Sequence, residues 1–96
     1  MNRFTLSVLA ANHPLYVGEC CSLVVPIAQG RYGILAHHSN TLAAIVPGLL
    51  EFTLPDGSKR TATVSKGIIK IENNGVLLLV DAVESAEEPT DPLDSQ

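Results

Sequence analysis

The chain has 96 residues, enough for one hydrophobic core and too few for two. Hydrophobic residues make up 46% of the sequence and charged residues 17%, which excludes global disorder. The longest apolar runs, residues 23–28 and 76–80, are far shorter than the roughly 20 residues that a membrane-spanning helix needs. The N-terminus also lacks the continuous apolar stretch of a signal peptide. We therefore expect a cytosolic chain without membrane insertion.

The net charge of −4 comes from the C-terminal end of the chain. Five of the ten acidic residues lie from Glu84 onward, where there is no Lys or Arg. The rest of the chain is nearly neutral, and its one close basic pair is Lys59 with Arg60. Nucleic-acid binding requires clustered positive charge, so we expect no nucleic-acid partner.

The residues that could carry chemistry do not form a recognisable set. Cys20 and Cys21 are adjacent, and neighbours on a strand point to opposite faces, so we expect two reduced thiols that pack as small apolar groups. His37 and His38 diverge for the same reason and make a poor metal site. The sequence also lacks a Gly-x-Ser-x-Gly elbow and a phosphate-binding loop. We expect no catalytic residue, nucleotide site, metal or cofactor.

Short segments rich in Val, Ile, Leu and Thr predict an all-β fold, because turn residues interrupt them every eight to twelve positions. The first segment, residues 4–8, alternates apolar and polar side chains as a half-buried strand does. Pro26 marks a bulge or an edge in a long strand over residues 19–28. The predicted strands cover residues 4–8, 19–28, 34–36, 41–46, 49–54, 58–65, 68–72 and 76–80.

Turn residues between these segments predict mostly local hairpin connections. Residues 29–33 form a turn bracketed by glycines, residues 55–57 a tight hairpin turn, and residues 73–75 a type I′ hairpin turn. Each sheet must bury one face, so we predict a two-sheet antiparallel β-sandwich of about 8–10 short strands. The sandwich spans residues 1–84, and we expect residues 85–96 to be a disordered acidic tail containing prolines.

A few residues have no evident structural role. They are Arg31 and Tyr32 at the expected turn and the segment 37–40 after it. Exposed loop residues of this kind more often bind than pack, which predicts a non-catalytic domain that docks onto a partner. An apolar patch should then be exposed, with Leu42, Ile45, Leu49 and Tyr32 as candidates.

The same region resembles the epsilon subunit of bacterial F-type ATP synthase. The family pattern is a glycine, two residues, Gly-Ile, three residues, His, then Leu, and later Pro-Gly. The flanking stretches 4–8 and 64–69 also fit, with Lys66 in place of the first glycine of the family's Gly-Gly pair, and the match covers residues 4–83. The positions that carry the pattern are Gly30, Gly33, Ile34, His38, Leu42, Pro47 and Gly48.

The resemblance implies a ten-stranded β-sandwich that is a non-catalytic rotor subunit of the central stalk. This subunit links the γ subunit to the ring of c subunits and couples ion translocation to ATP synthesis. It would lie on the cytoplasmic side of the cell membrane within a peripheral complex. Carried over residue by residue, the c-ring contact is Gln29, Gly30, Arg31 and Tyr32, and the γ contact is His38, Leu42 and Ala43.

Two departures from the family pattern are visible. Arg31 stands where the family often has an acidic residue, so the matching position on the c subunit should be acidic or neutral. The family usually continues into an inhibitory C-terminal hairpin of two helices, whereas residues 84–89 here are acidic and end in proline. We therefore expect a natural short form without the inhibitory helices.

The alternative is a free-standing carrier or ligand-binding β-domain of lipoyl or biotinyl type. Such a domain carries a lysine at a hairpin tip, flanked by Asp or Met. Lys59 and Lys66 have other neighbours and do not match this pattern. A small all-β enzyme, the third possibility, is disfavoured by the missing acid–base set.

Overall fold

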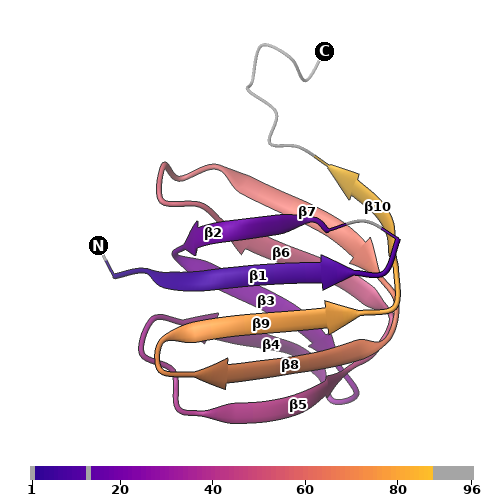
Figure 1. Ribbon diagram of the computed structural model, residues 1–96, viewed down its shortest axis with the longest axis horizontal. Helices are drawn as coiled ribbons and strands as arrows, with labels where there is room; N and C mark the ends of the chain where they lie inside the picture. The colour runs from indigo at the N-terminus through magenta and orange to yellow at the C-terminus, as the bar shows by residue number, and fades with distance from the viewer. Residues whose placement is uncertain (1, 13, 88–96) are drawn as a thin grey trace.

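Two five-stranded sheets pack face to face in the computed structural model, which describes residues 2–12 and 14–87 (Figure 1). Sheet A has the strand order β2-β1-β9-β8-β5, and sheet B has the order β10-β7-β6-β3-β4. This architecture confirms the predicted all-β sandwich. The described residues contain no helix long and apolar enough to span a membrane.

Ten strands make up the two sheets. All neighbouring strands pair antiparallel except β1 and β9, which pair in parallel at the centre of sheet A. The strands are β1 (Phe4–Ala10), β2 (Tyr16–Cys20), β3 (Ser22–Ile27), β4 (Gly30–Leu35), β5 (Thr41–Ile45), β6 (Gly48–Thr53), β7 (Lys59–Val64), β8 (Gly67–Glu72), β9 (Gly75–Val80) and β10 (Val83–Glu87).

The core lies between the sheets and is built by alternate residues of each strand. In β1, for example, Phe4, Leu6 and Val8 are buried while the residues between them are not. Burying one large apolar side chain contributes about 1.5–3 kcal/mol, and the core holds many of them. Among the described residues no polar or charged side chain is buried. The largest fully buried side chains include Phe52, Leu6, Leu23, Leu50, Ile69 and Leu78.

The predicted long strand over residues 19–28 is wrong, because the chain changes sheets within it. β2 ends at Cys20 in sheet A, and β3 begins at Ser22 in sheet B. The backbone N–H of Cys21, between them, donates to the carbonyl of Thr53 at 2.8 Å. The crossing needs one residue and no Gly or Pro, so the apolar run conceals it. Cys20 and Cys21 are not joined by a disulfide, and Cys20 is buried.

The predicted turn at residues 29–33 is also wrong. The chain turns at Ala28 and Gln29, and β4 begins at Gly30 and pairs with β3, Tyr32 lying opposite Val25. Gly30 has a φ of 127°, a conformation that side-chain-bearing residues rarely adopt, so it marks the end of the turn. Gly33, by contrast, lies within β4 and does not mark a turn.

The hairpin turn between β8 and β9 is confirmed. Asn73 and Asn74 have φ values of 52° and 60°, the two left-handed residues of a type I′ turn. Glu72 and Gly75 pair across the turn. The turn therefore presents two asparagines close together at one end of sheet A.

Strand β10 has no counterpart among the predicted strands. It pairs with β7, Ala86 lying opposite Ala62, so Ser85–Glu87 belong to the sandwich although they were assigned to the tail. The side chain of Asn12 also holds the start of β10: its Nδ2 donates to the Val83 carbonyl and its Oδ1 accepts from the Val83 N–H, both at 3.1 Å. The remainder of the tail, residues 88–96, lies outside the described residues.

Candidate functional site

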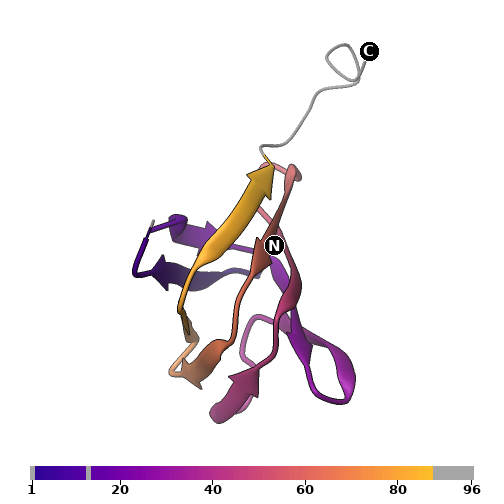
Figure 2. The same cartoon turned by 90° about the vertical axis from the view of Figure 1, so that its right-hand side faces the viewer.

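The predicted contact residues are divided between the two ends of β4. Gln29 and Gly30 lie at the β3–β4 turn, whereas His38 lies in the connection from β4 to β5, at the other end of the strand. Figure 2 shows β4 and the β3–β4 turn on the side of sheet B opposite to β10. Gln29 and Gly30 are thus separated from His38 by the length of β4.

Arg31 lies on the outer face of sheet B, and its guanidinium forms an ion pair with the carboxylate of Glu51 on β6. The two side chains are 45% and 39% exposed. The expectation of Arg31 in an exposed turn is therefore corrected: its charge is balanced by a neighbour on its own sheet. A partner that approaches this face meets a paired cation.

Tyr32 points inward and packs against the core. Its hydroxyl lies 2.8 Å from Nε2 of His38, and the two rings meet edge to face with centroids 5.5 Å apart. Nδ1 of His38 lies 2.8 Å from the carbonyl oxygen of Ser39, which can only accept. In the neutral ring Nδ1 therefore carries the proton, and Nε2 accepts from Tyr32. A predicted c-ring residue and a predicted γ residue thus hold each other in place.

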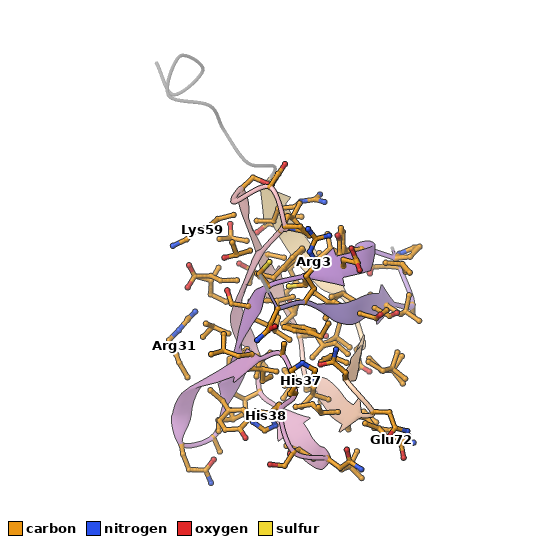
Figure 3. All side chains as sticks on the ribbon, turned by 90° about the vertical axis from the view of Figure 1, so that its left-hand side faces the viewer. Arg3, Arg31, His37, His38, Lys59 and Glu72 are labelled. Carbon is orange, nitrogen blue, oxygen red and sulfur yellow. The ribbon has the colours of Figure 1, made fainter. Side chains whose placement is uncertain are left out.

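The segment 37–40 is tied to the β8–β9 turn. The His37 N–H donates to Oδ1 of Asn74 at 2.7 Å, and the Asn73 N–H donates to Oδ1 of Asn40 at 3.4 Å. His37 has a φ of 64°, which is unusual for a residue with a side chain. The segment that had no evident structural role in the sequence is thus a hydrogen-bonded connection between the sheets (Figure 3).

The outer face of sheet A carries a row of apolar residues, one from each of four neighbouring strands. Leu9 on β1 lies opposite Leu79 on β9, Leu79 opposite Ile68 on β8, and Ile68 opposite Ala44 on β5. Ile68 is 46% exposed and Leu79 39% exposed. We call this row, together with Leu42, Leu77 and Val17 beside it, the apolar face.

The predicted apolar patch is partly corrected. Leu42 is 71% exposed and belongs to the apolar face. Leu49 is also exposed, but it lies on the outer face of sheet B. Ile45 is buried in the core, and Tyr32 faces inward, so neither lines an exposed patch. Ala43 likewise packs against the core.

Sequence reasoning missed Ile68 and Leu79. The run 76–80 is apolar throughout, so its pattern predicts a buried strand and does not indicate which of its residues face outward. The signal that could have identified the patch is the alternation of β8, which places Ile69 and Ile71 inward and therefore Ile68 outward. The hairpin partner of Ile68, which is Leu79, must then face outward too.

Among the residues that the structure describes, three titratable groups outside the predicted contacts have shifted pKa values, each with a local cause. Burial raises the pKa of the Cys20 thiol, whose Sγ lies 3.0 Å from the Ser22 carbonyl. Burial also raises the pKa of Tyr16, whose hydroxyl donates to the Glu19 carbonyl. Hydrogen bonds from Ser58 lower the pKa of Asp56 in the β6–β7 turn. The described residues hold no group of three or more His, Cys, Asp or Glu placed to bind a metal.

Comparison with known proteins relates most of the chain to one family. Residues 3–86 match the family model described as ATP synthase, delta/epsilon chain, beta-sandwich domain. The chain is 34% identical over 89 residues to the ATP synthase epsilon chain of Neisseria meningitidis serogroup C, covering 91% of this chain and 64% of that protein. It is 31% identical over 85 residues to that of Protochlamydia amoebophila (88% and 58% covered). For that of Sulfurimonas denitrificans the identity is 27% over 81 residues (84% and 62% covered).

Two solved structures share the fold. A chain of the Euglena gracilis mitochondrial ATP synthase, in a structure of OSCP, F1 and the c ring, superposes with a TM-score of 0.81 at 20% identity, covering 88% of this chain and 54% of that one. A chain of the Tetrahymena thermophila mitochondrial ATP synthase, in a structure of the central stalk and c ring, gives 0.70 at 11% identity, covering 84% and 65%. The chain spans between 58% and 64% of the length of the three sequence relatives.

Proposed function

We propose that this chain, which belongs to the family of ATP synthase delta and epsilon chains, is a non-catalytic subunit of the central stalk of an F-type ATP synthase. In this role it links the γ subunit to the c ring and couples ion translocation to ATP synthesis. The family match lies in the β-sandwich domain. The observation that carries the proposal is the family match over residues 3–86, which includes β1 to β9 and all of β10 except Glu87. The carrier-domain alternative is not favoured by this match.

The sandwich suits a part that transmits torque by its shape. Its core is apolar, and the side chains that bridge its segments are hydrogen-bonded, as between Asn12 and Val83. Protein interiors packed in this way deform little and transmit strain. A rigid body placed between a rotating shaft and a ring needs contact surfaces and stiffness, and it needs no reactive group.

The apolar face of sheet A is the surface that we assign to the γ subunit. Leu42, a γ contact implied by the family resemblance, lies on this face beside the row formed by Ile68 and Leu79. A contiguous exposed apolar patch on a soluble domain marks an interaction site. His38 lies in the connection that leads into β5, four residues before Leu42. Ala43 faces the core and supports this surface from beneath.

The β3–β4 turn is the surface that we assign to the c ring. Gln29 and Gly30 are exposed there, and Arg31 follows on the outer face of sheet B. Because Glu51 balances the charge of Arg31, the turn presents polar groups without a net charge, and a neutral position on the c subunit suits it. Tyr32 acts from inside by holding His38. The complex places the chain at the cytoplasmic side of the membrane.

The test is recovery of the partners from the intact enzyme. A tagged copy of the full chain, expressed in its own cell, should retrieve the γ and c subunits from detergent-solubilised membranes. Removal of the chain should lower ion-driven ATP synthesis, and the wild-type chain should restore it. Failure to retrieve γ under conditions that keep the rest of the enzyme assembled would overturn the proposed function.

A further inference from the structure

We propose that Asn74 is a positioning residue that holds the connection 37–40 in the conformation in which His38 meets its partner. The inference rests on the function proposed above and names a residue that need not touch the partner. It concerns the end of the sandwich at which the N-terminal residues, the β4–β5 connection and the β8–β9 turn lie together (Figures 1 and 3).

Both polar atoms of the Asn74 carboxamide form hydrogen bonds. Its Oδ1 accepts from the His37 N–H at 2.7 Å, and its Nδ2 donates to the Arg3 carbonyl at 2.8 Å. The carbonyl of the same residue accepts from the Thr5 N–H at 3.3 Å. One side chain therefore joins a turn of sheet A to two segments that lie 37 and 71 residues away along the chain.

The connection 37–40 depends on this bond more than an ordinary loop would. His37 has a φ of 64°, a left-handed conformation that is unfavourable for a residue with a side chain and persists only when its surroundings enforce it. The hydrogen bond from the His37 N–H to Oδ1 of Asn74 helps to hold His37 in this conformation. The next residue, His38, then points its ring at Tyr32, and both ring nitrogens are engaged.

A second bond anchors the far end of the connection. The Asn73 N–H donates to Oδ1 of Asn40, which immediately precedes β5. Both ends of the connection are thus docked on one turn, although the connection itself joins sheet B to sheet A. Releasing the Asn74 end frees His37 to leave the left-handed conformation, and His38 moves with it.

The fraction of molecules in which the connection 37–40 is correctly held determines the expected effect on γ binding. A partner that recognises His38 in this position binds only the fraction of molecules in which the connection is correctly held, and its apparent affinity falls by that fraction. Asn74 therefore contributes to binding through His38. The same reasoning predicts that substituting Asn74 no longer changes the affinity for the partner when the His38 side chain is absent.

The chain offers a matched pair of variants. Asn74→Gly removes both side-chain bonds, and glycine accepts the φ of 60° without strain and keeps a favoured type I′ sequence. Asn73→Gly changes the adjacent residue of the same turn, whose φ is 52°, and keeps its backbone bond to Asn40. The two variants differ mainly in the loss of the Asn74 carboxamide.

Two measurements on the full-length chain test the proposal: amide hydrogen exchange at His37 and the affinity for purified γ subunit. Asn74→Gly should accelerate exchange at His37 and weaken γ binding, each by about tenfold, while Asn73→Gly stays within about twofold of wild type. In a His38→Ala background, Asn74→Gly should cause no further loss of affinity. Asn74→Asp keeps an acceptor for the His37 N–H and should bind γ much better than Asn74→Gly.

The outcomes separate this inference from the proposed function. Equal γ affinity for wild type, Asn74→Gly and Asn73→Gly overturns the positioning role, and so does a loss that simply adds to that of His38→Ala. If wild type does not bind γ, the proposed function fails. The exchange contrast then still decides whether Asn74 holds the connection, because unchanged exchange at His37 in Asn74→Gly contradicts it.

Discussion

The outer faces of the two sheets differ, although both sheets contribute to one core. Sheet A exposes a row of apolar side chains in register, with Ile68 and Leu79 at its centre. Sheet B exposes mainly Thr, Ser and charged residues, and its exposed leucines, Leu35 and Leu49, lie in different rows. Outward residues are not needed to bury the core, so the difference reports on what each face meets outside the domain.

The outer face of sheet B, which we call the polar face, shows how a sheet is stabilised without creating a docking surface. Thr61 lies opposite Glu51, and Thr53 lies opposite Lys59, so β-branched and charged pairs stand across neighbouring strands. Arg31 adds an ion pair with Glu51. In the apolar face, polar residues interrupt only the row beside the centre, where Lys70 lies between Leu42 and Leu77 and Ser7 lies between Leu77 and Val17.

The largest expected effect separates the inside of sheet A from its outside. Leu78 is fully buried and Leu79 is 39% exposed, and they are neighbours in β9. Leu78→Ala should lower the free energy of unfolding by about 2–5 kcal/mol because it leaves a cavity. Leu79→Ala should lower it by less than about 1 kcal/mol. Urea unfolding of the isolated chain measures both, and similar losses would show that the apolar face is part of the core.

The next effect separates the two outer faces by binding. Ile68→Lys places a charge at the centre of the apolar face and should weaken γ binding by at least about 30-fold, since the interface would bury it unpaired. Thr61→Lys makes a similar charge change on the outer face of sheet B and should change affinity by less than about threefold. Calorimetric titration with the γ subunit measures the dissociation constants of both variants. A larger loss for Thr61→Lys would move the γ site to sheet B.

A smaller effect is expected from the ion pair on the polar face. Arg31 and Glu51 are each more than a third exposed, so solvent screens their interaction. Arg31→Ala should change the free energy of unfolding by at most about 1 kcal/mol, and less at high salt. Glu51→Ala is the matched change, and it leaves Arg31 unbalanced beside the β3–β4 turn. Unfolding at two salt concentrations measures the pair, and a salt-independent difference would contradict a screened surface contact.

The smallest effect concerns the β6–β7 turn, which closes the polar face at one end. Ser58 bonds lower the pKa of Asp56 below its ordinary value of 3.8. A carboxyl whose pKa is lower in the folded state stabilises the fold above its unfolded pKa, and this contribution is lost as the pH falls through the folded pKa. Asp56→Asn should therefore reduce the fall in Tm between about pH 5 and about pH 2. An equal fall in Tm in wild type and Asp56→Asn would contradict a stabilising role of the ionised Asp56 carboxylate.

The sequence predicts the fold class well because alternation and turn residues are local signals. The segments around β1, β6, β7 and β8 and the type I′ turn are close to where they were expected. The sheet crossing at Cys21 lacks any turn residue, and Gly33 suggests a turn where the strand continues. Strand β10 contains Glu and Ser, which a local pattern assigns to a tail.

The candidate site was only partly predictable, because its geometry depends on contacts between distant residues. Leu42 is exposed, as expected from the resemblance and its position. The bond between Tyr32 and His38 and the bond from His37 to Asn74 join separate elements, so no local pattern indicates them. The apolar face likewise emerges only when the register places Leu9, Leu79 and Ile68 side by side.

The parallel pairing of β1 with β9 has a consequence for how the chain is made. Thr5 lies opposite Gly75, so the centre of sheet A joins two segments that are far apart along the chain. Contacts of such wide sequence separation form slowly and cannot begin before both strands have left the ribosome. We therefore expect the sandwich to complete its fold only after β9 has been translated. Before that point a nascent chain lacks Leu79 between Leu9 and Ile68, so its apolar face is incomplete and cannot dock.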